Sequence, residues 1–85
     1  MNKKEFIVLI PVDFKKSYEV AQAFMGKEFK QLGDVATSIT EALTEDESEE
    51  DEEVLVYSIE GFARAINNQE FESMSNYYTA SVYVV

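Results

Sequence analysis

The stretch Phe6-Ile7-Val8-Leu9-Ile10 is an uninterrupted run of apolar residues, and three of its five members are β-branched. A run that is apolar at every position, rather than at every second one, is typical of a strand covered on both faces. Pro11 follows and has no N–H to donate, so strand pairing should weaken there. We therefore predict a buried central strand over residues 6–10.

Apolar residues at the spacing of an α-helix follow this strand. The apolar residues at that spacing are Tyr18, Ala21, Met25, Phe29 and Leu32, with Asp13 or Ser17 as the expected N-cap. Gly26 weakens the middle of this helix by roughly 1 kcal/mol relative to alanine. Gly33 is the predicted stop and Asp34 the next cap, before a second short helix with the stripe Val35, Ile39, Ala42 and Leu43.

The second half of the chain predicts a strand over residues 54–57, then a helix, then a final strand. Ser58 is placed to cap the helix, whose apolar face carries Ile59, Phe62, Ala63 and Ile66, and Asn67-Asn68 ends it. Residues 77–85 alternate, with Ala80 and Val82 on one side. The order β-α-α-β-α-β predicts a small α+β fold, a three-stranded sheet with helices packed on it.

The whole chain of 85 residues is expected to be one domain, since two cores would each be too small at this length. It carries 17 acidic and 7 basic residues, for a formal net charge of -10. The apolar run near the start has only five residues, fewer than the roughly 7 to 15 of a signal peptide. No stretch approaches the roughly 18 apolar residues of a membrane span, so we expect no membrane association. The lack of cysteine fits a cytoplasmic protein.

Most of the negative charge lies in one segment. Residues 45–53 hold eight acids in nine positions, and removing them leaves a net charge of only -2 on the other 76 residues. Such a run repels itself and cannot bury apolar surface, so residues 44–53 are predicted to form a flexible acidic loop. The predicted partner-binding residues are its carboxylates, Glu45, Asp46, Glu47, Glu49, Glu50, Asp51, Glu52 and Glu53.

The final strand, residues 77–85, contains no charge, so it is poorly defended against pairing with another chain. One prediction is a self-association edge that forms a homodimer, with Tyr77, Thr79, Ser81 and Tyr83 on its outer face. The alternative is an internal strand that simply belongs to the core.

The residue inventory excludes several chemistries. With no His and no Cys there is no Ser-His-Asp triad, thiolate nucleophile or Cys/His zinc site. The acidic run lacks the glycine of an EF-hand loop, so no specific metal site and no cofactor are expected. Asp13, just past the central strand, is the one carboxylate placed like a site residue, and a helix cap is the simpler interpretation. We predict that the protein is not an enzyme.

With these chemistries excluded, the partners that remain are proteins with a basic surface. Direct nucleic-acid binding is disfavoured, because phosphate contacts require clustered bases. A fully extended acidic run would place its charges roughly 3.7 Å apart, close to the roughly 3.4 Å between phosphates along one DNA strand. In size, acidity and lack of catalytic residue types the chain resembles small bacteriophage or mobile-element accessory proteins, including anti-restriction and anti-CRISPR inhibitors. That resemblance implies an inhibitor that mimics nucleic acid and occupies the basic groove of a DNA- or RNA-binding protein. The alternative is an assembly protein that self-associates through its last strand, with the acidic run only solubilising.

Overall fold

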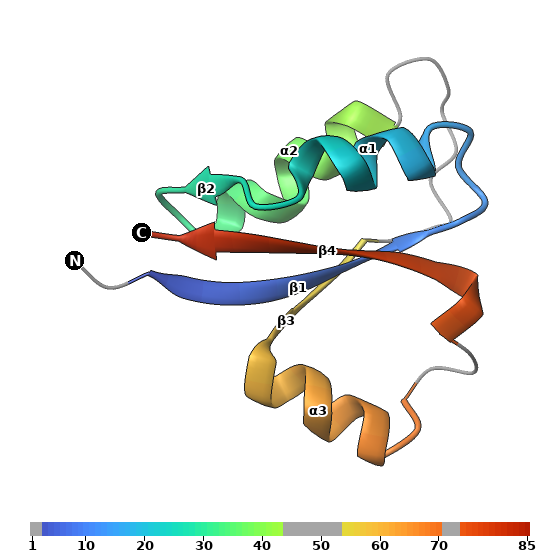
Figure 1. Ribbon diagram of the computed structural model, residues 1–85, viewed down its shortest axis with the longest axis vertical. Helices are drawn as coiled ribbons and strands as arrows, with labels where there is room; N and C mark the ends of the chain where they lie inside the picture. Colours follow the sequence, from blue (N-terminus) through green and yellow to red (C-terminus); the bar gives the residue numbers. More distant parts are fainter. Residues whose placement is uncertain (1–2, 44–53, 71–73) are drawn as a thin grey trace.

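Four strands and three helices make up the computed structural model, which describes residues 3–43, 54–70 and 74–85 (Figure 1). In chain order the elements are β1 (Lys4–Pro11), α1 (Ser17–Phe24), β2 (Glu28–Phe29), α2 (Gly33–Leu43), β3 (Leu55–Ser58), α3 (Ile59–Asn67), a 3-10 turn (Met74–Asn76) and β4 (Tyr77–Val84). This is a mixed α+β architecture, as the sequence predicts.

One sheet contains all four strands in the order β2-β4-β1-β3. β1 pairs antiparallel with β4 over its whole length, from Lys4 opposite Val84 to Pro11 opposite Tyr77. On its other side β1 pairs antiparallel with the shorter β3, with Leu9 opposite Leu55. The prediction that residues 6–10 form a strand inside the sheet is confirmed. Apolar residues at successive positions of this strand are buried on either face, because both faces of the sheet carry helices.

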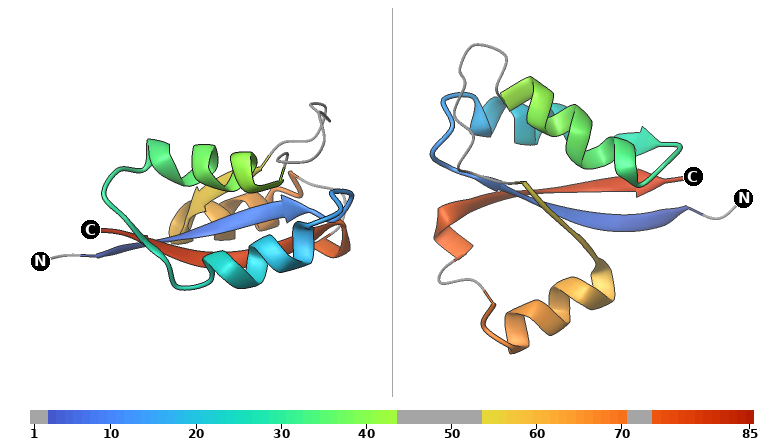
Figure 2. Two further views of the ribbon diagram at one scale, coloured as in Figure 1. Left: turned by 90° about the horizontal axis from the view of Figure 1, so that it is seen from above. Right: turned by 180° about the vertical axis from the view of Figure 1, so that it is seen from behind.

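The main core lies between the sheet and the pair α1 and α2, which share one face (Figures 1 and 2). Val8 and Ile10 of β1 point to this face and are fully buried. Val35 and Ile39 of α2, also fully buried, meet them from the helical side. Because side chains alternate along a strand, β4 contributes its even-numbered residues, of which Ala80 and Val82 are buried as predicted.

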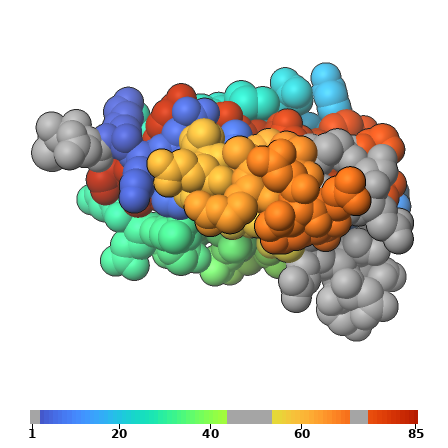
Figure 3. All heavy atoms as spheres, turned by 90° about the horizontal axis from the view of Figure 1, so that it is seen from below, coloured from blue at the N-terminus to red at the C-terminus, as the bar shows by residue number. Residues whose placement is uncertain are grey.

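The opposite face is covered in part by α3, which Figure 3 shows beside exposed atoms of β1 and β4. The Ser58 hydroxyl accepts a hydrogen bond from the Gly61 N–H at 3.0 Å, so the predicted N-cap of this helix is confirmed. Phe62 packs against Tyr57 of β3 with their rings 6.1 Å apart. Ala65 is the only fully buried residue of α3, so this helix lies on the sheet through a narrow contact.

The prediction of three strands is wrong, because a fourth strand lies within the segment expected to be one long helix. α1 ends at Phe24, and Gly26 takes a φ of 79°, a left-handed conformation that breaks the helix. The chain then runs parallel to β4, where the Tyr83 N–H donates to the Lys27 carbonyl at 2.8 Å. Phe29 remains in the core as the helical pattern required, but it arrives there from a strand.

The start of α1 also differs from expectation, since neither Asp13 nor Ser17 caps it. Lys16 occupies the N-cap position and makes no side-chain cap bond. Ser17 is 1% exposed, and its hydroxyl lies within hydrogen-bonding distance of the carbonyl oxygens of Pro11 and Phe14 (2.9 Å to the latter). The hydroxyl therefore ties the helix to the end of β1, because a buried carbonyl needs a donor that the ladder no longer supplies there.

Candidate functional site

The acidic residues predicted to bind a partner, 45–53, lie outside the described residues, but the two elements that flank them are described. Leu43 ends α2 and is 3% exposed. Val54 precedes β3 and packs against the main core. The eight carboxylates therefore lie between two points of the chain that are both anchored in the core.

The pairing of β3 with β1 shows where along the sheet one of these anchors, Val54, lies. Leu55 pairs with Leu9, so the chain enters β3 beside the C-terminal half of β1. Two residues further along β1, Pro11 pairs with Tyr77 at the start of β4. The acidic segment thus leads into the sheet at the end where β1 finishes and β4 begins.

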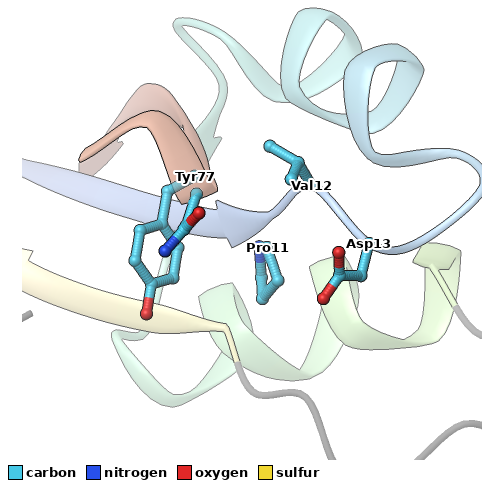
Figure 4. Close-up of a pocket in the computed structure, with 5 residues that line it drawn as sticks. Pro11, Val12, Asp13 and Tyr77 are labelled. Carbon is cyan, nitrogen blue, oxygen red and sulfur yellow. The ribbon is translucent and has the colours of Figure 1, made fainter. Parts of the chain in front are cut away.

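A small hollow of about 240 Å³ lies at this same end, between the turn after β1 and the start of β4 (Figure 4). It is lined by Pro11, Val12, Asp13, Asn76 and Tyr77. The Val12 N–H donates to the Asn76 carbonyl at 3.0 Å, which extends the β1–β4 pairing by one further bond. This bond joins two of the residues that line the hollow.

Asp13 is exposed, and among the described residues that line this hollow it is the only carboxylate. In Figure 4 Pro11 lies between the Asp13 carboxylate and Tyr77, whose hydroxyl points toward β3. Acid-base chemistry by paired carboxylates needs two groups whose environments separate their pKa values. The described lining, Pro11, Val12, Asp13, Asn76 and Tyr77, contains a single carboxylate and so provides no such pair, and its geometry does not favour a catalytic role for Asp13.

Metal binding receives no support from the described part of the chain. Within residues 3–43, 54–70 and 74–85, no three His, Cys, Asp or Glu side chains are grouped so that they could hold an ion. Among the same residues, no helix has the length and apolar character needed to cross a membrane.

Charge on the described part of the protein is almost balanced. Its residues carry eight carboxylates and seven basic side chains, for a net charge of -1. Asp34 and Glu41 lie on α2, whereas Glu60 lies on α3, across the sheet (Figure 1). These three acids therefore do not gather on one face of the described structure.

The predicted self-association residues Tyr77, Thr79, Ser81 and Tyr83 all lie on β4, which has β1 on one side and β2 on the other. β4 is therefore an interior strand, and the prediction of a free edge is wrong over the part that β2 covers. β2 pairs only with Tyr83 and Val84. Just beyond it the Ser81 carbonyl accepts from the Gly26 N–H, and the Ser81 N–H donates to the Met25 sulfur at 3.4 Å. Dimer formation through these residues stays a prediction.

Exposed apolar side chains are the feature that sequence reasoning missed. On α3, Ile59 and Ile66 are 46% and 45% exposed, although the helical pattern placed both on the apolar face of the predicted helix. The pattern correctly identified an apolar stripe, but it could not show that the sheet would contact α3 mainly through Ala65.

No protein-family model matches this chain, and no curated protein or solved structure is significantly similar to it.

Proposed function

We propose that this protein is a non-enzymatic interaction module whose acidic segment, residues 45–53, binds a basic surface on another protein. The observation that carries the proposal is the division of charge. The described domain has a net charge of -1, whereas residues 45–53 alone carry -8. The field that a partner meets at a distance is therefore dominated by one short segment.

Electrostatic attraction of this kind acts mainly on the rate of association. A concentrated charge steers an oppositely charged partner over distances of about the Debye length, roughly 8 Å at physiological ionic strength. The complex should form quickly and weaken strongly as salt is added. Anchoring at Leu43 and Val54 supports this role, because a segment held at both ends has less conformational entropy to lose on binding than a free tail.

A basic groove built for nucleic acid is the partner surface that we favour, because one extended acidic segment resembles one phosphate strand in charge spacing. The opposite placement of Asp34 and Glu60 argues against imitation of a whole duplex face. The proposal is therefore for competition with a single strand, in a cytoplasmic DNA- or RNA-binding protein.

Two variants of equal net charge test the proposal. The first neutralises four acids of the run, Glu47→Gln, Glu49→Gln, Glu50→Gln and Asp51→Asn. The second neutralises four exposed acids of the domain, Glu19→Gln, Asp34→Asn, Glu41→Gln and Glu60→Gln. Both variants reduce the net negative charge, from -10 to -6.

Binding to a lysine-rich peptide and to single-stranded-nucleic-acid-binding proteins of the source cell is then measured at low and high salt. We expect the first variant to lose about tenfold or more in affinity and the second to change by less than about threefold at low salt. Equal losses in the two variants would show that net charge matters rather than the run, and would refute the proposal.

A further inference from the structure

β3 forms one end of the sheet, with β1 on one side and no strand among the described residues on the other. Which of its main-chain groups are open follows from the ladder, because alternate residues of an antiparallel strand face the same neighbour. The N–H groups of Tyr83 and Val85 donate to the β2 side. The even-numbered residues of β4 therefore face β1.

The pairing of β4 with β1, and of β1 with β3, extends this alternation of inward- and outward-facing residues to β1 and β3. The odd-numbered residues of β1 face β3, so Leu55, opposite Leu9, and Tyr57, opposite Ile7, turn their main-chain groups toward β1. Val56 between them directs its N–H and carbonyl outward, away from the sheet. Within the described part of the chain neither group has a hydrogen-bond partner. No described residue therefore covers the hydrogen-bonding edge of β3 at Val56.

The two edges of the sheet are protected differently. β2 is two residues long and lies among charges: Lys27 and Lys30 flank it, and the Glu28 carboxylate accepts from the Lys3 ammonium at 2.6 Å. Short length and charged side chains are how proteins prevent pairing at an edge. β3, with the sequence Leu-Val-Tyr-Ser, has no charged residue at all. Charged side chains therefore oppose pairing with another chain at β2, whereas no charged side chain of β3 opposes it there.

We propose that β3 is the docking edge for an extended basic segment of the partner, which adds to the sheet beside it as a further strand. This inference rests on the proposed function and says how the partner is held. Strand addition supplies main-chain hydrogen bonds that give affinity, and contacts with the side chains of the added strand give specificity. Residues 45–53, with their eight carboxylates, immediately precede Val54 in the sequence, so a strand that pairs with β3 has one end at the point where the acidic sequence joins β3. A lysine- or arginine-rich segment complements that charge.

A second copy of this chain fits the edge less well. If two copies paired antiparallel through β3, Val54 of one copy, where the acidic sequence joins β3, would lie near the C-terminal end of β3 in the other. The hollow at that end is lined by Lys3, Lys4, Glu5, Ser58, Ile59 and Glu60, whose charges cancel. Parallel pairing would bring two runs of -8 together. Neither arrangement provides the excess of positive charge that the run requires.

Two peptides that have the same charge but different backbones test the proposal. The probe is an alternating lysine–valine peptide long enough to pair with all of β3, and its control is the same sequence N-methylated at every residue, which cannot donate main-chain hydrogen bonds. Amide hydrogen exchange at Val56 reports pairing at β3. The Glu28 amide is the internal control, because Lys27 and Phe29 accept from β4 and Glu28 therefore points outward at the other edge.

We expect the unmethylated peptide to slow exchange at Val56 by about tenfold or more, to leave Glu28 within about twofold, and to bind about tenfold more tightly than the methylated one. Equal binding of both peptides with no change at Val56 would overturn strand addition and leave the electrostatic function standing. Binding of neither peptide would overturn both. Protection of Val56 that rises with protein concentration alone, together with a dimer in sedimentation, would assign the edge to a second copy and overturn the proposal.

Discussion

The main-chain N–H of Gly26 donates to the carbonyl oxygen of Ser81 at 2.6 Å, and this bond joins the end of α1 to β4. It is followed by the bonds from Tyr83 to Lys27 and from Val85 to Phe29, which set β2 parallel to β4. One residue in a left-handed conformation thus converts an apolar helical pattern into a helix followed by an edge strand.

The left-handed Gly26 makes a specific prediction about stability. Nothing lies within 4 Å of a Cβ built there, so Gly26→Ala meets no steric clash and is penalised only through its φ of 79°. We expect the free energy of unfolding to fall by about 1 to 2 kcal/mol. Gly33→Ala is the matched control, since its Cβ also enters open space and its φ is not left-handed. Urea unfolding of both variants tests this, and equal midpoints would contradict it.

The buried hydroxyl of Ser17 is predicted to stabilise the junction between β1 and α1. Ser17→Ala leaves the buried carbonyls of Pro11 and Phe14 without this donor, so we expect a loss of about 1 to 3 kcal/mol. Thr37→Ala serves as the control, because the Thr37 hydroxyl donates to the Gly33 carbonyl at an exposed site. That substitution should change stability by less than about 0.5 kcal/mol. Similar losses from the two substitutions would show that burial of the Ser17 hydroxyl carries no special weight.

Isoleucine substitutions compare the two faces of the sheet. Ile39 is fully buried between α2 and the sheet, whereas Ile66 on α3 is 45% exposed. We expect Ile39→Ala to destabilise by about 2 to 5 kcal/mol, because it removes buried methylenes and leaves a cavity. Ile66→Ala should cost about 1 kcal/mol or less. Chemical denaturation measures both, and a large loss at Ile66 would mean that the α3 face is more tightly packed than its exposure indicates.

Alkaline pH should reveal the environment of Tyr57. Burial raises the pKa of its phenol, and the charges of Glu70 and Tyr77 raise it further. The folded pKa exceeds the unfolded one, so this phenol contributes stability that is complete below about pH 10, the ordinary tyrosine pKa, and is lost as the pH rises through the folded value. Tyr57→Phe should therefore flatten the alkaline fall in stability.

The measurement is the urea midpoint of wild type and Tyr57→Phe from neutral to alkaline pH. Tyr18→Phe, at a residue 60% exposed, is the control for removal of a surface phenol. Identical slopes for wild type and Tyr57→Phe above about pH 10 would contradict the assignment.

The local elements were predictable because their signals are local. The apolar run at 6–10, the Ser58 cap and the alternation of residues 77–84 each depend on neighbours within a few positions, and all three appear in the structure as expected. The concentration of charge in residues 45–53 is likewise a property of the chain alone.

Tertiary structure decided the rest. Whether Phe29 reaches the core from a helix or a strand depends on Gly26 meeting Ser81, a residue 55 positions away, and periodicity cannot distinguish the two. The same holds for the sheet order, which makes β4 interior and leaves Val56 of β3 at an edge. Side-chain patterns indicate which residues avoid water. They do not indicate which strands become neighbours, because the main-chain groups that pair strands are the same in nearly every residue. The sequence alone therefore identified the acidic segment, and the fold determined that the strand following it in the chain, β3, lies at one end of the described sheet.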